Sequence, residues 1–180
     1  MKNRCGAFNL KLWGLAALAV LATGCQTEPV YTSKEDSPDT QLTALRIHVE
    51  GAPDSSGRTV QVPVFRERPI LVTVDREPFL TEGNVTKAEV VDEPGGFSLR
   101  IEFERQGRWL LEKYTGQYRG RRLAIFASFG SERWIGAPLI QAVISDGKFT
   151  FTPDASREEA LRIARGLNNY AKKMEHDPRF

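Results

Sequence analysis

From residue 42 onward, apolar and polar residues alternate in short runs, which predicts half-buried strands. The alternation covers residues 45–49, 60–64 and 70–74. Pro63 interrupts the second run and favours an edge position, because a proline nitrogen cannot donate a hydrogen bond to a neighbouring strand. His48 falls among the polar positions of the first strand, so we expect its side chain on the exposed face.

A hairpin and a helix follow. Two alternating runs, 87–92 and 97–104, are separated by a Pro-Gly-Gly turn at 94–96 and predict paired strands. At Arg105 the period changes to that of a helix, which we expect to end within the glycine-containing segment 116–120.

Three further strands are predicted after this helix. The run 123–129 is largely apolar and predicts a central strand, because both of its faces must be covered. Residues 139–144 and 148–152 predict two more strands on either side of an Asp-Gly turn at 146–147.

The last element is an amphipathic helix. Ser156 and Glu159 have the spacing of a capping box at its start. The apolar positions that follow are three or four residues apart and comprise Ala160, Ile163, Ala164, Leu167, Tyr170, Ala171 and Met174. The predicted fold class is therefore α+β, with a mixed or antiparallel sheet packed on one face by two helices.

The N-terminal residues have the layout of an export signal. Basic residues within 2–11 precede a short apolar run, and small residues then lead to Cys25. This arrangement resembles a bacterial lipobox, although Ala22 stands where leucine is most common. The resemblance implies that residues 1–24 are removed as a signal peptide and that Cys25 is acylated. The alternative is an ordinary cleaved signal that contains a cysteine by chance.

The acylated cysteine would be followed by a tether and one domain. Residues 25–41 are rich in Ser, Thr, Pro and acidic residues, which predicts a flexible tether, and residues 42–176 form the single predicted domain. We expect a lipid-anchored protein of the bacterial cell envelope that faces the periplasm. Gln26 slightly favours the outer membrane, because Asp at this place favours inner-membrane retention in enterobacteria.

Composition limits the possible classes of function. The chain has 180 residues, of which 41% are apolar and 27% charged, a globular mix that excludes wholesale disorder and a polytopic membrane protein. Its formal charge is +2, but the first 25 residues hold three basic and no acidic side chains. The remaining 22 basic and 23 acidic side chains nearly balance, so we expect no nucleic acid partner.

Candidate chemistry is sparse. Two cysteines and two separated histidines give no metal-ligand spacing, so we expect no metal and no cofactor. The nucleophile elbow, the phosphate loop and the zinc-protease motif are all absent from the sequence. Glu102 and Glu104 share the polar face of one strand, where a solvated surface explains them. We therefore expect no catalytic residues and no enzymatic activity.

A basic stretch is the strongest charge feature. Residues 100–122 contain seven basic and three acidic side chains, and Arg119, Arg121 and Arg122 are its densest part. One interpretation is a solvated loop and strand edge. The other is a binding surface for anionic lipid or an acidic partner.

Several short motifs follow one another in a distinctive order. Gly120 begins Gly-Arg-Arg-Leu-Ala-Ile, Gly136 begins Gly-Ala-Pro-Leu-Ile, and Glu158 begins Glu-Glu-Ala. This order resembles the head of the first periplasmic domain of SecD, an accessory subunit of the protein-export translocase, over about residues 86–172. The resemblance implies the fold and contact with extended polypeptide. The usual Asp-Gly turn after the Leu-Ala-Ile strand is missing, and the membrane-spanning half of SecD has no counterpart, so motor function is not implied.

Three functions remain open. The preferred hypothesis is a non-enzymatic envelope lipoprotein that binds an unidentified protein or peptide, and the alternative is a structural or assembly lipoprotein that docks into a larger complex. A small periplasmic hydrolase is the third, without a residue set to support it. An apolar groove beside an open strand edge would favour the first, a flat apolar patch the second, and a cleft with buried carboxylates or a histidine the third.

The anchor can be tested directly. We expect the mature protein to begin at Cys25 and to partition into detergent, and Cys25→Ser to leave an unacylated, misprocessed precursor. Mass spectrometry of the N-terminal peptide checks this, and an unmodified Cys25 or another mature start would contradict it.

Overall fold

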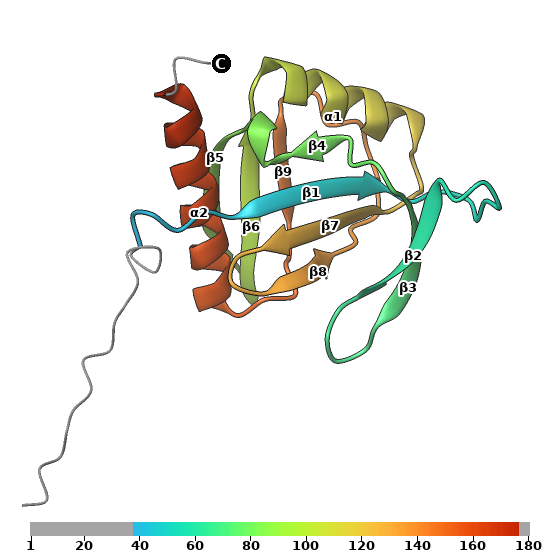
Figure 1. Ribbon diagram of the computed structural model, residues 1–180, viewed down its shortest axis with the longest axis horizontal. Helices are drawn as coiled ribbons and strands as arrows, with labels where there is room; N and C mark the ends of the chain where they lie inside the picture. The colour runs from blue at the N-terminus through green and yellow to red at the C-terminus, as the bar shows by residue number, and fades with distance from the viewer. Residues whose placement is uncertain (1–37, 177–180) are drawn as a thin grey trace, which may run out of the picture. The chain divides into compact units, whose positions relative to one another are not determined.

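The computed structural model describes residues 38–176, and Figure 1 shows their arrangement. The elements in chain order are β1 (Ala44–Val49), β2 (Thr59–Val64), β3 (Ile70–Asp75), β4 (Leu80–Thr81), the 3-10 helix η2 (Glu82–Asn84), β5 (Val85–Glu93), β6 (Gly96–Phe103), α1 (Arg105–Gln117), β7 (Leu123–Ser128), β8 (Glu132–Gly136), β9 (Lys148–Phe151) and α2 (Arg157–Glu175). No helix within the described residues is long and apolar enough to cross a membrane.

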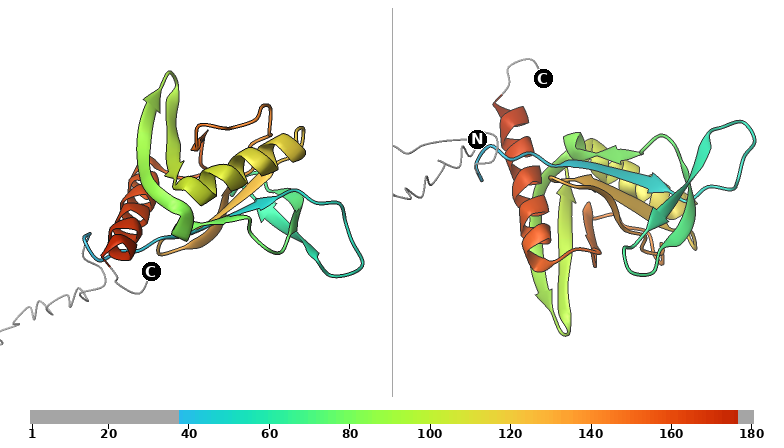
Figure 2. Two further views of the ribbon diagram at one scale, coloured as in Figure 1. Left: turned by 90° about the horizontal axis from the view of Figure 1, so that it is seen from above. Right: turned by 60° about the horizontal axis from the view of Figure 1, so that its bottom comes forward.

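The strands form three sheets in which every pairing is antiparallel. The largest has the order β4-β1-β7-β8, a second pairs β5, β6 and β9 in that order, and β2 and β3 form a separate hairpin. The predicted α+β class is therefore confirmed, and β7 is the central strand that its apolar run predicts. Figure 2 shows that α1 and the β5–β6 hairpin lie on the same side of β1.

The main core lies between the inner face of the four-stranded sheet, the β5-β6-β9 sheet and the two helices. Its fully buried side chains include Leu45, Ile47, Leu99, Ile101, Leu111, Leu123, Ile125, Ile163 and Leu167. They come from β1, β6, β7, α1 and α2, so this cluster holds together elements that are distant in the sequence. Burial of this apolar surface is the main favourable contribution to folding.

A second, smaller core lies on the opposite face of β7. The β2–β3 hairpin covers that face, and the cluster comprises Val62, Val64, Val72, Val74, Ala124 and Ala137. Arg76 N–H donates to the Arg58 carbonyl at 2.9 Å, so these two residues form a hydrogen-bonded pair of the β2–β3 ladder. In an antiparallel ladder every second residue bonds to the partner strand, so the backbone of Pro63 points away from β3. Within residues 38–176 no strand pairs with β2 on that side, which confirms the predicted edge position.

Helix α2 begins with the predicted capping box. Glu159 N–H donates to Ser156 Oγ at 3.1 Å, and Ser156 N–H donates to Glu159 Oε2 at 2.7 Å. Further along, the Asn168 amide both accepts from and donates to the backbone of Ala88 on β5, each at 2.8 Å. This pair of bonds satisfies part of the edge of β5, which is one way that a sheet edge is protected from wrong pairing.

Two predictions about strands are wrong, namely the strand at 139–144 and the exposed position of His48. Residues 139–144 form a loop beside α1 and not a strand. Leu139 makes a single bridge with Arg122, Ile140 N–H donates to the Arg121 carbonyl, and Ile144 N–H donates to Thr115 Oγ1 on the helix. The structure instead forms β8 at 132–136, which the sequence pattern did not predict. The alternating pattern predicts an exposed side chain for His48, but the β2–β3 hairpin covers it and leaves it only 6% exposed.

Two helical glycines give opposite predictions for the same substitution. A Cβ on Gly166 in α2 would lie 2.1 Å from Thr43 Oγ1 and 2.8 Å from the Thr43 backbone nitrogen, whereas a Cβ on Gly116 in α1 meets only Val143 at 3.8 Å. We expect Gly166→Ala to lower the free energy of unfolding by about 1–3 kcal/mol or more, because the backbones must separate. Gly116→Ala should raise it by up to ~1 kcal/mol through helix propensity.

Urea denaturation of both variants checks this pair. Equal effects of the two substitutions would contradict the close packing of α2 on Thr43, the residue before β1.

Candidate binding site

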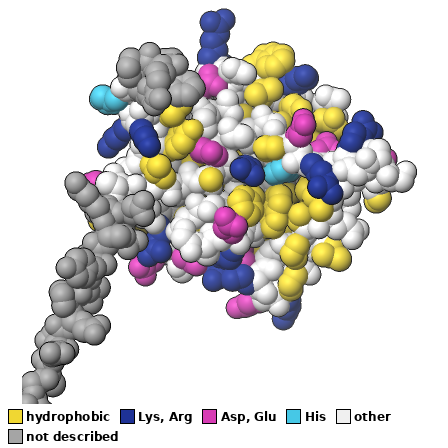
Figure 3. All heavy atoms as spheres, viewed as in Figure 1, with side chains coloured by type: hydrophobic (Ala, Val, Ile, Leu, Met, Phe, Trp, Pro, Cys, Tyr) yellow, Lys and Arg dark blue, Asp and Glu magenta, His cyan; other side chains and the backbone are white. Residues whose placement is uncertain are grey.

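An apolar hollow lies on the outer face of the four-stranded sheet. Its volume is about 290 Å³, and it is lined by Arg46, His48, Val60, Val74, Arg76, Phe126 and Trp134. These side chains come from β1, β2, β3, β7 and β8 and from the residue that follows β3. Figure 3 shows apolar side chains gathered over β7 and β8, with a histidine and basic side chains beside them.

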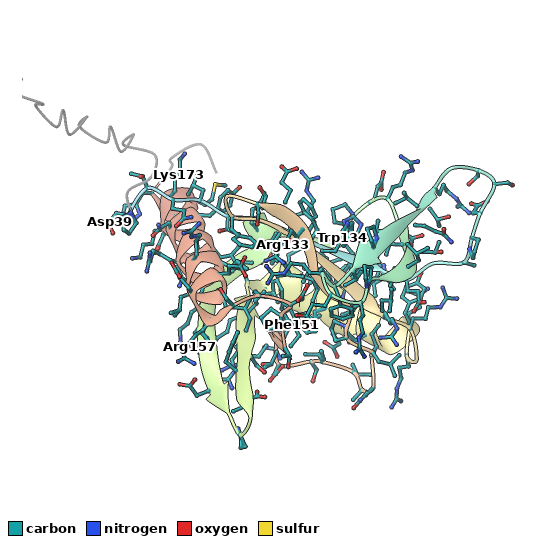
Figure 4. All side chains as sticks on the ribbon, turned by 90° about the horizontal axis from the view of Figure 1, so that it is seen from below. Asp39, Arg133, Trp134, Phe151, Arg157 and Lys173 are labelled. Carbon is teal, nitrogen blue, oxygen red and sulfur yellow. The ribbon has the colours of Figure 1, made fainter. Side chains whose placement is uncertain are left out.

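The floor of the hollow is aromatic. Trp134 makes edge-to-face contacts with Phe126 and His48, at ring centroid distances of 5.5 Å and 5.2 Å. Phe126 and Trp134 pair across β7 and β8, and both are half-buried. Figure 4 shows Trp134 on the side of β8 toward the β2–β3 hairpin, while Arg133 next to it lies toward α2. The floor therefore offers rigid, partly accessible aromatic surface.

His48 is held in one orientation. Its Nδ1 lies 2.7 Å from the Asp75 carbonyl, which can only accept, so Nδ1 carries a proton and donates it to that oxygen. Burial lowers the pKa of His48 below its usual value of 6.5, and the bond to Asp75 opposes this shift only in part. The neutral ring therefore dominates at neutral pH and leaves Nε2 as an acceptor.

The charges of the hollow are positive. Arg46 and Arg76 are exposed at its rim, and none of the described residues that line it is acidic. Within the described part of the chain, the lining contains no hydroxyl or thiol side chain beside His48. Within residues 38–176 no three His, Cys, Asp or Glu side chains group in a way that could hold a metal ion. The hollow suits an apolar side chain accompanied by an acidic group.

An open strand edge adjoins the hollow. Val60 lines it from β2 and is 37% exposed, and its neighbour Gln61 is exposed as well. Gln61 lies two residues before Pro63 on β2, so its backbone N–H and carbonyl also point away from β3. An apolar hollow beside a free edge is the geometry that accepts extended polypeptide in other proteins.

Comparison with known proteins places the fold. The sequence profile of the SecDF P1 head subdomain matches residues 59–171. The chain belongs to this family. The match begins upstream of the resemblance at about residue 86 and takes in the β2–β3 hairpin, so most of the hollow lies within the family region, while Arg46 and His48 precede it.

Solved structures of SecDF show the same fold. One is described as a membrane component that enhances protein export, and it aligns with a TM-score of 0.52 at 22% identity over 72% of this chain and 63% of its own. A second, SecDF in a super-membrane-facing form, gives a TM-score of 0.52 at 22% identity over 76% of this chain and 21% of its own. This chain therefore spans less than two thirds of either. None of the curated proteins matches it.

The predicted basic residues lie away from the hollow, in the part of the P1 head where α1 leads into β7. Arg119 donates to the Gln141 carbonyl at 3.2 Å, Arg121 to the Glu50 carbonyl at 3.0 Å, and Arg122 to the Ala137 carbonyl at 2.9 Å. Each guanidinium therefore holds a neighbouring backbone segment. Arg121 also lies over the ring of Tyr118, with 5.5 Å between its Cζ and the ring centroid.

Arg121 lines a larger cleft of about 880 Å³ as well. The cleft lies between the loop after β1, the end of β3 and the C-terminal half of α1. Three basic and three acidic side chains line it: Arg58, Arg76, Arg121, Asp54, Asp75 and Glu77. This balance gives the cleft no preference for one sign of charge.

The sequence analysis missed Phe126, Trp134 and Arg46 as site residues. Phe126 lies within a run that is largely apolar, so nothing distinguishes it there, and Trp134 belongs to the strand that was not predicted. Arg46 is a polar position within the alternating run 45–49 and is exposed as that pattern predicts, but none of its neighbours along the chain indicates that an aromatic floor lies beside it.

His48 predicts a pH dependence of folding. Because its pKa is lower in the folded than in the unfolded state, the unfolded chain binds more protons below pH 6.5. The free energy of unfolding should therefore fall as the pH drops below 6.5, and the contribution of His48 should be constant above that value. Urea denaturation across this range checks the sign. His48→Gln should reduce the dependence and His176→Gln, at an exposed position, should not.

Proposed function

We propose that this protein is a membrane-anchored lipoprotein of the bacterial envelope whose P1 head domain binds polypeptide without enzymatic action, in a step linked to protein export. The observation that carries the proposal is the aromatic hollow with its cationic rim beside the free edge of β2. The link to export rests on family membership and on the description of a SecDF relative as enhancing protein export.

The hollow would recognise polypeptide through its backbone and alternate side chains. An extended segment that pairs with the edge at Gln61 points every second side chain toward the same face. One such side chain would enter the hollow between Val60 and Trp134. Arg46 and Arg76 would favour segments with an acidic residue nearby. Backbone pairing of this kind gives affinity with little sequence specificity, which suits many different polypeptides.

The anchor would keep the domain at the membrane surface. Residues 1–24, Cys25 and the tether to residue 37 lie outside the described residues, so the proposal for them rests on the export-signal pattern and the Gly24-Cys25 pair. Gln26 slightly favours the outer membrane, and membership of the P1 head family supports a domain that faces the periplasm. The proposed function needs no metal, no cofactor and no nucleic acid.

A structural or assembly role is the alternative, and one observation favours it. Leu71 is 70% exposed and its neighbour Ile70 is 36% exposed, at the end of the β2–β3 hairpin. Exposed aliphatic side chains at the tip of a hairpin can dock on a fixed partner. A fixed partner would give one complex, whereas a polypeptide-binding site would contact many chains.

Site-specific photocrosslinking in intact cells separates these functions. A photoreactive phenylalanine analogue replaces Val60 at the hollow, and the same analogue replaces Leu161 on α2, which is 45% exposed, as the matched control. We expect position 60 to crosslink to many exported polypeptides, and the crosslinks to disappear when export is blocked. Phe126→Ala in the same background should weaken them, because the floor of the hollow is lost.

The outcomes are distinct. A single product that persists when export is blocked supports the structural role. The absence of crosslinks at position 60, or equal crosslinks at positions 60 and 161, would overturn polypeptide binding by the hollow. A melting temperature close to wild type for Phe126→Ala ensures that weaker crosslinking reports on the site and not on unfolding.

A further inference from the structure

A second surface joins α1 to the loop at 139–147. Arg108 Nε donates to the Ser145 carbonyl at 2.7 Å near the start of the helix, and Arg119 donates to the Gln141 carbonyl at 3.2 Å beyond its end. Between them, Thr115 Oγ1 accepts from Ile144 N–H at 3.0 Å. The loop therefore runs antiparallel to α1 along its length, and the two form one continuous face, called here the α1 face.

Large apolar side chains protrude from the α1 face. Trp109 is 57% exposed on the helix, and Val143 and Leu139 are 46% and 47% exposed on the loop. Gly116 leaves room for Val143 beside the helix, since even a Cβ there would lie 3.8 Å from it. Trp109 borders a shallow hollow of about 430 Å³ and Leu139 a separate one of about 180 Å³, so the three side chains do not share one pocket.

Basic side chains surround the apolar ones. Arg105, Arg108, Lys113 and Arg119 are exposed on the α1 face, against two exposed acidic residues, Glu112 and Asp146. The carboxylate of Glu104 is engaged in capping the helix, where it accepts from Gly107 N–H at 2.7 Å. Lys113 Nζ lies 5.1 Å from the ring centroid of Trp109, so a cation lies directly beside this exposed aromatic ring. The face is net positive, although the chain after residue 25 is nearly balanced.

We infer that the α1 face docks on the surface of an anionic lipid bilayer. Exposed Trp and aliphatic side chains on a helix whose outer face is basic are the pattern of interfacial membrane binding: the apolar groups enter the headgroup boundary and long cationic side chains contact lipid phosphates. Exposed apolar residues with long cationic neighbours fit a fluid surface better than a shaped protein partner, which requires complementary packing.

This docking would also orient the hollow. The helix α1 lies on the inner side of β1 together with the β5–β6 hairpin, whereas the hollow opens on the outer face of the same sheet. When the α1 face rests on lipid, the sheet separates the hollow from the bilayer, so the hollow faces away from the membrane and stays accessible. The inference does not depend on what the hollow binds.

Quenching of Trp109 by brominated lipid tests the inference. The full chain is reconstituted into vesicles of phosphatidylcholine alone or with about one third phosphatidylglycerol, with and without bromine on the acyl chains. The Trp109 signal is the difference between the wild type and Trp109→Phe. We expect bromine to quench this signal in vesicles with phosphatidylglycerol and not in phosphatidylcholine alone, and high salt to reverse the quenching.

Charge-matched variants complete the test. Arg105→Gln with Lys113→Gln should lower the ratio of docked to undocked domain about 20- to 30-fold. Arg58→Gln with Lys173→Gln removes the same charge from exposed positions elsewhere and should leave quenching unchanged. Quenching that is equal in both lipids, absent from both, or equally reduced by the two double variants would overturn the inference.

Discussion

β7 packs between two apolar clusters, and the positions of both candidate surfaces follow from that. Leu123, Ile125 and Ala127 point into the main core, while Ala124 on the other face meets the valines of the β2–β3 hairpin. A strand covered on both faces cannot tolerate a polar side chain where the cover is complete. The strand is therefore apolar almost throughout, and its neighbours β1 and β8 are fixed in register beside it.

The hairpin covers only part of the outer face, and the hollow forms where that cover ends. Val60 and Val74 make one wall, and the sheet residues Arg46, Phe126 and Trp134 stay accessible beyond it. Glu159 helps to fix this arrangement, because its carboxylate pairs with Arg133 of β8 at 3.0 Å and with Arg66 of the hairpin loop at 3.2 Å, while it also caps α2. One side chain thus connects the start of α2 to both elements that border the hollow.

The two surfaces lie on opposite sides of the four-stranded sheet and differ in chemistry. The hollow is concave, with aromatic rings that are packed against one another and with cations only at its rim. The α1 face exposes separate apolar side chains among long basic ones. Concave apolar surface with a few fixed polar groups suits a specific guest, whereas exposed apolar side chains among cations suit a fluid interface. A domain with both could hold polypeptide at a set distance from a membrane.

The local features of this protein follow from its sequence alone. Alternation determined β1, β2 and β3, the capping box at Ser156 determined where α2 begins, and the ordered motifs after Gly120 indicated the SecD head. Each depends on residues close together in the chain, where the spacing of side chains fixes which face they share.

Only the tertiary structure decided the positions of residues 139–144, of His48 and of Trp134. The first segment is hydrogen-bonded to Thr115 of α1 and to Arg121 beyond that helix. The hairpin that buries His48 meets the main sheet just past the end of β1, where Glu50 forms a bridge with Val74. Trp134 lies beside Phe126 because β8 pairs with β7. The sequence of β8 lacks the apolar and polar alternation that would predict a strand there. Contacts between distant segments decide such positions, and a local pattern contains no information about them.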